Sequence, residues 1–191
     1  MCSCGYGVDG ERMRKVTHGS LPTCVGDHKS RWRTAGHRTV QSHGHQLLAD
    51  ALDGKCEVQG TPEIGILDVY LTDAAHNDPL MQGLTPQMKC LQWHSVAVTQ
   101  PPTGAELLAS SPDCTWQAMR VGKRAWGIQF HVELQDQTIS EWNEVPAYAA
   151  ALDKVKGPGA LKVMEDEALQ YMPQFKDNAR LLFDNFCQSM G

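Results

Sequence analysis

The pattern of apolar and polar residues changes abruptly near residue 43. Residues 1–43 contain one Leu, no Ile and no Phe, so they cannot supply a core-facing strand or helix of ordinary length. Downstream, large aliphatic residues recur with regular spacing to the end of the chain. We therefore predict an irregular segment over residues 1–38 and a single folded domain over residues 39–191.

Regular spacing predicts a succession of short elements in the folded part. Leu47, Leu48, Ala51 and Leu52 share one helical face, and Gly54 is the expected left-handed residue that ends this helix. Strands are predicted where β-branched residues are dense and turn residues follow. These runs are residues 56–60, 64–72, 88–98 and 107–111.

The remaining part of the chain predicts a hairpin followed by helices. Two alternating runs are separated by Gly122 and Lys123, a pair typical of a tight hairpin turn. The spacing then becomes helical, and Pro173 is expected to interrupt the last helix because its ring removes a backbone donor. The hairpin runs are residues 116–122 and 124–134, and the helical runs begin at residue 138 and resume after a break at residues 157–159.

Composition and charge narrow the class of protein. The 191 residues are 41% hydrophobic and 20% charged, which is ordinary for a globular chain. No run approaches the roughly 18 apolar residues of a membrane-spanning helix, and the N-terminus lacks the apolar core of a signal peptide, so a cytoplasmic location is expected. Residues 1–43 carry seven Lys and Arg against three Asp and Glu, but no nucleic-acid-binding motif accompanies them. Neither a membrane nor a nucleic acid is an expected partner.

The seven cysteines lie at positions 2, 4, 24, 56, 90, 114 and 187, without a Cys-x-x-Cys motif. This odd number and wide scatter argue against both a disulfide framework and a zinc site. His43 and His45 form a close pair, but no third ligand is suitably spaced, and no phosphate-binding Gly-rich loop is seen. The sequence therefore predicts neither a metal site nor a cofactor.

Two short constellations carry the candidate chemistry. Ser42 directly precedes the first predicted helix, whose N-terminal amides stabilise developing negative charge, and Gly44 would allow a sharp strand-to-helix turn. At the end of the hairpin, Glu133 follows His131 by two residues, a spacing that gives a base and its orienting carboxylate. Together they follow the logic of a triad of nucleophile, base and orienter.

From about residue 42 to residue 191 the sequence resembles a class I (triad-type) glutamine amidotransferase domain, nearest to the stand-alone GMP-synthase-like group. The matching motifs, in chain order, are Gly44-His45-Gln46-Leu47-Leu48, Gln92-Trp93-His94-Ser95, Leu107-Leu108-Ala109-Ser110-Ser111-Pro112, Gln117-Ala118-Met119-Arg120 and Gly127-Ile128-Gln129-Phe130-His131-Val132-Glu133.

The resemblance implies a fold, an activity and a set of roles. The fold is α/β and flavodoxin-like, with a mostly parallel sheet, flanking helices and an antiparallel hairpin. The activity is hydrolysis of the side-chain amide of glutamine, with the ammonia passed to an acceptor or to a synthase on a partner chain. His131 is the implied general base and Glu133 its orienter. The implied glutamine-pocket residues are Gly44, Gln46, His94 and Ser95.

The chain also departs from the family pattern. The family elbow reads Gly-x-Cys-x-Gly-His-Gln, whereas Val40 and Ser42 stand here at the first Gly and at the Cys. Ser42 is expected to lower turnover by orders of magnitude or to abolish it, because a hydroxyl is a far weaker acid than a thiol. The stretch before the elbow is polar where the family has a buried strand. The N-terminal part of the fold is therefore expected to be truncated or altered, and a reading-frame shift is one hypothesis for its origin.

Two classes of function stay open on the sequence. The protein is an enzyme, either a glutamine amidotransferase or a γ-glutamyl peptidase, in which Ser42 or another thiol such as Cys56 replaces the missing Cys. Alternatively it is a non-catalytic pseudoenzyme that retains the pocket by descent and binds a ligand or a partner. Selective alkylation of one thiol, blocked by glutamine, would favour the first class.

Overall fold

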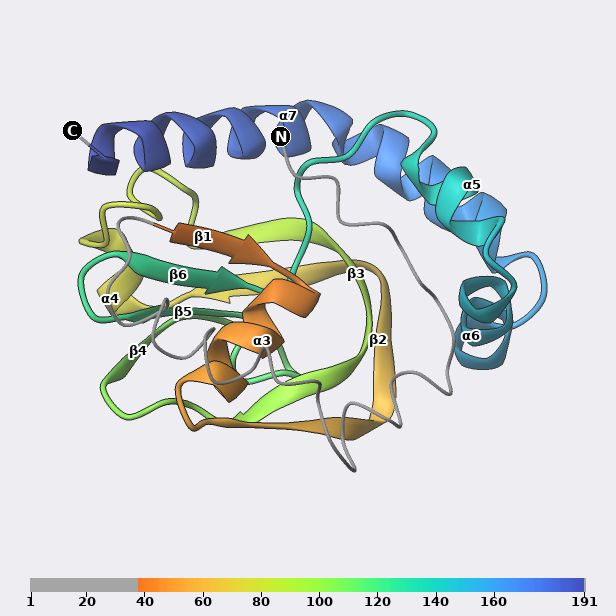
Figure 1. The fold of residues 1–191 in the computed structure, drawn as a ribbon. Coiled ribbons are helices and arrows are strands. Elements are labelled where there is room, and N and C mark those ends of the chain that lie inside the picture. Colours follow the sequence, from red (N-terminus) through yellow and green to blue (C-terminus); the bar gives the residue numbers. More distant parts are fainter. Residues whose placement is uncertain (1–37, 191) are drawn as a thin grey trace.

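A computed structural model describes residues 38–190, which form a curved six-stranded sheet with helices on both sides (Figure 1). The segment predicted to be irregular, residues 1–38, lies outside the described residues except for Arg38. In chain order the elements are β1 (Arg38–Gln41), α3 (His43–Ala51), β2 (Lys55–Leu71), α4 (Asp73–His76), β3 (Gln87–Gln100), β4 (Ala105–Ser110), β5 (Ala118–Val121), β6 (Ala125–Ile128), α5 (Thr138–Asn143), α6 (Pro146–Lys156) and α7 (Ala160–Met190).

The strand order of the sheet is β1-β6-β5-β4-β2-β3. Only β1 and β6 pair in parallel, and the four other pairings of the described strands are antiparallel. The expectation of a mostly parallel sheet is therefore not met within the described residues. The connections of β4 to β5 and of β5 to β6 explain two of these pairings, because each is shorter than the dozen or more residues that a parallel crossover requires.

The strands β2 and β3 are long and wrap around one side of the molecule as a half-barrel (Figure 1). The two predicted strands at residues 56–60 and 64–72 are thus one continuous strand. Its register against β3 shifts between Val58 and Glu63, around Pro62, which has no amide hydrogen to donate to a ladder. The irregularity lets β2 stay paired with β3 on both sides of the bend.

Apolar side chains alternate between the two faces of the sheet. In β5, Ala118 packs into the core beneath the C-terminal part of α7, whereas the next residue, Met119, packs against Leu48 and Ala49 of α3. A third apolar cluster joins the β2–β3 bend to the three C-terminal helices and includes Ile64, Ile66, Leu91, Trp93, Leu152, Met164, Met172 and Phe175. Helix α3 is therefore held on the face of the sheet opposite α7.

Helix α3 ends differently from the sequence prediction. Asp53, not Gly54, adopts the left-handed conformation, with a φ of 67°. The amides of Asp53 and Gly54 donate to Asp50 and Ala49, respectively, in a Schellman pattern. Gly54 is needed for space instead, since a Cβ atom there would lie 2.7 Å from the carbonyl oxygen of Gln100.

The prediction that Pro173 interrupts the last helix is wrong. Helix α7 runs without a break from Ala160 to Met190, and Pro173 lies inside it on the exposed side. Met172 and Phe175, on either side of this proline, are buried in the same apolar cluster. Packing on both sides therefore outweighs the one hydrogen bond that proline removes.

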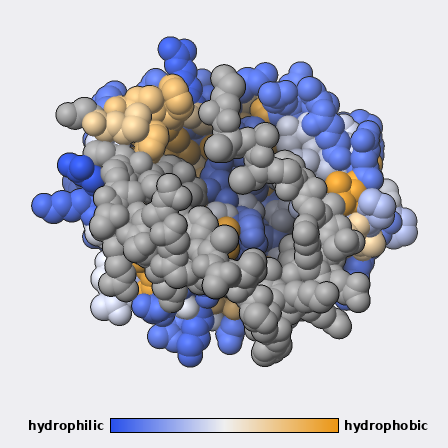
Figure 2. All heavy atoms as spheres, viewed as in Figure 1, coloured by the Kyte–Doolittle hydropathy of each residue, from blue (hydrophilic) through white to orange (hydrophobic). Residues whose placement is uncertain are grey.

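None of the helices in residues 38–190 has the length and apolar character needed to span a membrane. In the view of Figure 2 the described surface is largely hydrophilic, and hydrophobic colour gathers near the C-terminal end of α7. This end of the helix carries Phe183 and Met190, whose side chains are exposed.

Candidate active site

Ser42 occupies a strained turn between β1 and α3. Its φ of 47° and ψ of −112° lie in a region that residues with a side chain rarely adopt. The Ser42 amide donates to the carbonyl of Ile128 at 2.6 Å, and the Ser42 carbonyl accepts from the amide of His45 at 2.9 Å. This is the geometry of a strand–turn–helix nucleophile elbow, which presents one side chain at the start of a helix.

The turn was expected to depend on Gly44, and this detail is wrong. Gly44 lies within the first turn of α3 and is absent from the residues of positive φ, whereas Ser42 carries the strained conformation itself. The first amides of α3 have no acceptor within the helix, because a helix begins with unpaired donors. Those of His45 and Gln46 donate to the Ser42 carbonyl, which fixes the turn to the start of the helix.

The parallel pairing of β1 with β6 brings the elbow to the second constellation. Gln41 pairs with Ile128, the last residue of β6, and the chain then runs through Gln129 toward His131. The Gln41 side chain donates from Nε2 to Glu133 Oε2 at 2.8 Å. The residue before the predicted nucleophile is thus bonded directly to the predicted orienter.

His131 and Glu133 form a close pair. The Nδ1 of His131 lies 2.5 Å from Glu133 Oε1, and the amide of Val132 donates to Glu133 Oε2 at 3.0 Å. The imidazole packs edge-to-face on Trp142, with ring centroids 5.0 Å apart. Backbone bonds between His131 and Leu91 fix the segment to β3. These contacts hold the ring so that Nδ1 faces the carboxylate.

The electrostatics of Glu133 favour its ionised form. Burial would by itself raise the pKa of Glu133, but the hydrogen bond and charge of His131, with backbone and Gln41 donors, hold that pKa below its usual value. A carboxylate at this position retains the proton on Nδ1 of His131 and leaves Nε2 free to accept one. Among the described side chains, no hydrogen bond joins Ser42 to His131; such bonds tighten when substrate is present.

The residues predicted to line a glutamine pocket lie on α3 and β3. Gln46 donates from Nε2 to the carbonyl of Val96 at 3.0 Å and to Gln129 Oε1 at 3.1 Å. Ser95, the neighbour of Val96, is half-buried on β3. The structure thus brings the first turns of α3 next to the Ser95 region and to the segment that leads to His131.

Gly127 of β6 allows this close approach. A Cβ atom at Gly127 would lie 2.5 Å from Nδ1 of His45, the fully buried histidine of α3. The His45 ring also bonds through Nε2 to the carbonyl of Trp116 at 2.9 Å. Burial, and to a smaller extent the nearby charge of His94, lowers the pKa of His45 to about 4. Two backbone hydrogen bonds act in the opposite direction but are outweighed.

His94 faces a buried polar cluster. Its Nε2 lies 3.2 Å from Glu63 Oε2, and both side chains are almost fully buried. Glu63 also accepts from Ser111 Oγ at 2.6 Å and from Gln117 Nε2 at 2.9 Å. The sequence analysis does not predict Glu63, Ser111 or Cys114 as site residues. The one signal in the sequence is a charged residue, Glu63, at the start of an apolar run, and the structure places it opposite His94 in the β2–β3 register.

The thiol considered as a substitute nucleophile does not fit that role. Cys56 donates from Sγ to the carbonyl of Gln46 at 3.4 Å, on the inner side of α3. Burial, with the nearby charge of Asp50, raises the pKa of Cys56 to about 11. Cys56 is therefore a neutral thiol at physiological pH and lacks the reactive thiolate form.

A strand–turn–helix elbow beside a histidine–carboxylate pair is the architecture of triad-type acyl-transfer proteins. The family model "Glutamine amidotransferase class-I" matches residues 42–141, slightly more than half of the chain. The chain belongs to the class I glutamine amidotransferase family.

Curated relatives match about half to two thirds of the chain. A subunit of the GMP synthase [glutamine-hydrolyzing] of Sulfolobus acidocaldarius is 37% identical over 93 residues, covering 48% of this chain and 48% of that protein. The GMP synthase [glutamine-hydrolyzing] of Clostridium kluyveri is 31% identical over 129 residues, covering 67% of this chain and 24% of that protein. The chain spans about half the length of the Sulfolobus acidocaldarius protein and of two further GMP synthase subunits that it matches.

Solved structures share the fold over a longer stretch. A glutamine amidotransferase from Thermotoga maritima superposes with a TM-score of 0.74 at 22% identity, covering 95% of this chain and 74% of that one. A glutamine amidotransferase from Methylobacillus flagellatus gives a TM-score of 0.67 at 18% identity, covering 87% of this chain and 67% of that one. These likenesses confirm the flavodoxin-like class I amidotransferase fold.

Proposed function

We propose that this protein is a glutamine amidotransferase domain that binds glutamine beside Ser42 and whose turnover is limited by the serine at the nucleophile position. The observation that carries the proposal is the elbow: Ser42 keeps the strained φ of 47° at the start of α3, and Gln41 links that turn to Glu133. A strained conformation persists only where the surrounding structure enforces it. The backbone of a nucleophile site is thus retained although the sulfur is not.

The proposed reaction follows the triad logic. Ser42 Oγ attacks the γ-carbonyl carbon of glutamine while its proton passes to Nε2 of His131. His131 then gives that proton to the departing nitrogen, and ammonia leaves a glutamyl ester on Ser42. A water molecule attacks the ester with His131 again as the base, and glutamate is released as Ser42 recovers its proton. Glu133 holds the imidazole orientation throughout.

The side chain at position 42 sets the rate in this scheme. A cysteine thiol has an ordinary pKa of about 8.5 and becomes a thiolate beside a histidine, whereas a serine hydroxyl must lose its proton during the attack itself. The His131–Glu133 pair can assist that transfer, but the family scaffold is matched to sulfur. We therefore expect this chain to hydrolyse glutamine more slowly than family members that have the cysteine. A chain with no measurable turnover would be the pseudoenzyme.

The ammonia needs an acceptor that the described residues do not supply. The relatives that match are named as glutamine-hydrolyzing GMP synthases or as subunits of them, a name that joins glutamine hydrolysis to a synthase. By analogy, we assign the acceptor-activating role to a synthase on a partner chain.

The decisive experiment replaces the missing sulfur. Purified parent and Ser42→Cys protein are compared for glutamate release from glutamine under identical conditions. We expect the Ser42→Cys variant to exceed the parent by at least about 10²-fold, since the thiolate removes the need for concerted deprotonation.

A matched control adds a thiol elsewhere. Ser110→Cys places a sulfur at another half-buried position, on β4, and should leave glutamate release at the parent level. A glutamine-mimicking alkylating reagent should label the thiol introduced by Ser42→Cys, and glutamine should block that labelling. Silence from a correctly folded Ser42→Cys protein would overturn the enzymatic proposal and leave the non-catalytic alternative.

A further inference from the structure

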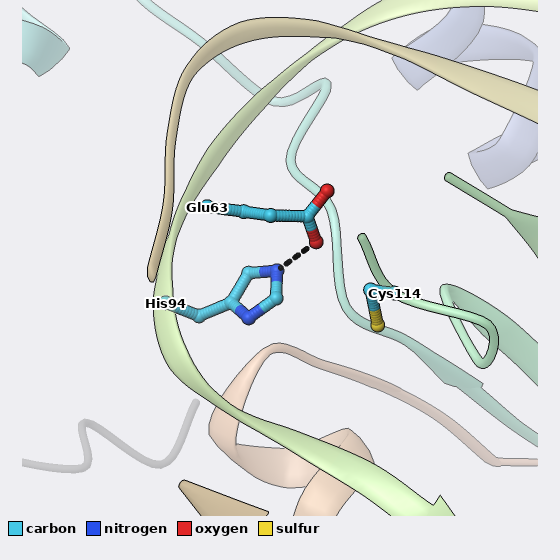
Figure 3. Close-up of side chains that lie close together, drawn as sticks. All are labelled: Glu63, His94 and Cys114. Carbon is cyan, nitrogen blue, oxygen red and sulfur yellow. Dashed lines mark ion pairs between the residues drawn. The ribbon is translucent and has the colours of Figure 1, made fainter. Parts of the chain in front are cut away.

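Three side chains of metal-ligating types lie close together in the interior. They are Glu63 from β2, His94 from β3 and Cys114 from the connection between β4 and β5. One ligand atom from each lies within 4.8 Å of the others, and all three residues are buried (Figure 3). We propose that this Glu63–His94–Cys114 cluster binds a zinc ion.

The histidine is already placed as a metal ligand. Its Nδ1 bonds to the carbonyl of Val96 at 3.2 Å, which directs Nε2 toward Glu63 and fixes the ring. Metal-bound histidines use the second nitrogen in this way. The Nε2 atom is buried and makes no well-aligned hydrogen bond, although Glu63 Oε2 lies 3.2 Å from it. A buried nitrogen without such a bond is costly unless something else satisfies it.

The carboxylate and the thiol are held by a second set of contacts. Ser111 Oγ donates to Glu63 Oε1 and accepts from the amide of Cys114 at 3.1 Å, so one hydroxyl orients two of the three ligands. Gln117 donates to Glu63 Oε2, and its own Oε1 is buried without a hydrogen-bond partner. Supporting bonds of this kind are typical of built metal sites.

The donor set and spacing select zinc. Zinc accepts a mixed set of thiolate sulfur, imidazole nitrogen and carboxylate oxygen, with bonds of about 2.0–2.3 Å. Ligands on a tetrahedral ion are then about 3.3–3.8 Å apart, and the 3.2 Å between His94 and Glu63 is already close to this value. A shift of Cys114 by about 1 Å closes the site. Binding displaces the thiol proton to solvent and forms the zinc–sulfur bond.

A route for the ion leads from the surface. A cavity of about 330 Å³ lies on the outer side of Cys114 and is lined in part by Gln59, Val98, Thr115 and Trp116. Cys114 belongs both to the wall of this cavity and to the buried cluster. The cavity therefore connects the surface to one of the three ligands, the Cys114 thiol.

The test uses the full chain, stripped with a chelator and then given Zn²⁺ alone. One equivalent of zinc should remain after gel filtration, measured by elemental analysis, and Zn²⁺ should raise the Tm. With Co²⁺ as the probe, the absorption of a tetrahedral thiolate complex should appear. Cys114→Ser and Glu63→Gln should each weaken zinc binding by more than about 100-fold.

Two controls exclude other thiols. Cys56→Ser removes a half-buried thiol outside the cluster and should leave zinc binding unchanged. The triple variant Cys2→Ser/Cys4→Ser/Cys24→Ser removes the cysteines of residues 1–37 and should also retain one equivalent. Glu63→Gln limits the folding defect, because the amide has nearly the same shape as the carboxylate and keeps one acceptor oxygen while it loses the anionic ligand.

The outcomes divide cleanly. The site is established if zinc binding and the cobalt–thiolate band are lost in the Cys114 and Glu63 variants and kept in the variants of the control cysteines. A chain that retains no zinc, or one that retains it in Cys114→Ser, overturns the proposal. None of these readouts uses glutamine, so failure here is distinguishable from failure of the proposed glutaminase activity.

Discussion

The described part of the chain contains two histidine–glutamate pairs whose settings differ in almost every respect. His131 and Glu133 are two residues apart in the chain, and the Glu133 side chain is 46% exposed. His94 and Glu63 come from different strands, and their side chains are 4% and 2% exposed. The first pair adjoins the elbow and, in the proposed reaction, exchanges a proton with the substrate. The second is enclosed and can only hold neighbouring groups, or an ion, in place.

This difference separates two uses of the same chemistry. A half-exposed carboxylate tunes an imidazole at a smaller cost to folding, because water continues to solvate part of the carboxylate. A buried carboxylate must have its oxygens satisfied, and Ser111 and Gln117 donate to those of Glu63, with His94 Nε2 3.2 Å away. A substitution that breaks the His131–Glu133 pair should therefore change the rate of glutamate release. A substitution that breaks the His94–Glu63 pair should change the free energy of unfolding.

The largest expected effect is on stability and comes from Glu63→Ala. The substitution leaves the hydroxyl of Ser111 and the amide of Gln117 without their buried acceptor and removes the carboxylate beside the His94 ring, and we expect a loss of about 3–5 kcal/mol in the free energy of unfolding. The matched variant Glu133→Ala should cost at most about 1 kcal/mol. Urea unfolding in the presence of a chelator measures both without a contribution from metal; equal losses would remove the distinction between the pairs.

The effect on kcat should be larger for the His131–Glu133 pair than for the His94–Glu63 pair, the opposite order from the effect on stability. In the Ser42→Cys background, Glu133→Gln should lower kcat for glutamate release by about 10²–10⁴-fold, because the amide no longer holds the imidazole in the tautomer with Nε2 free. Glu63→Gln in the same background should stay within about tenfold of its parent. If Glu63→Gln were the more damaging of the two, the buried pair would belong to the reaction and the assignment of roles would be reversed.

The contrast also explains what the sequence could predict. The His131–Glu133 pair is local, and its spacing along an extended segment is visible in the sequence. The elbow was predicted from a polar residue before a helix, although the strain falls on Ser42 and not on Gly44. The hairpin of β5 and β6 was likewise local, with Gly122 at positive φ in its turn.

The buried pair could not be predicted in the same way. Glu63 meets His94 only because the β2–β3 register shifts between Val58 and Glu63, and a shift by one residue would turn Glu63 to the other face of the sheet. That register depends on packing throughout the curved sheet. The continuity of α7 through Pro173 has the same origin, since tertiary contacts on both sides override a local preference.

A smaller effect on stability should appear in acid. His45 is fully buried with its pKa lowered to about 4, whereas an unfolded histidine is protonated near pH 6.5. The unfolded state therefore gains a proton first, and the folded protein should lose about 3 kcal/mol as the pH falls from about 6.5 to about 4. Urea unfolding across this window should show a flatter pH dependence for His45→Gln. His131→Gln serves as the control, and a slope that His45→Gln leaves unchanged would contradict the prediction.

The smallest effect should come from Gln41, the residue that joins the elbow to the exposed pair. Gln41→Leu removes the 2.8 Å hydrogen bond to Glu133 but leaves the bond between Glu133 and His131 in place. A hydrogen bond to a half-exposed carboxylate contributes about 1 kcal/mol, so kcat in the Ser42→Cys background should fall about fivefold with little change in KM. Gln41→Glu, which puts a second carboxylate beside Glu133, should be worse than Gln41→Leu, because like charges oppose each other. If instead both variants matched the parent, the bond seen between Gln41 and Glu133 would carry no weight in catalysis, and the carboxylate would depend on His131 and the backbone alone.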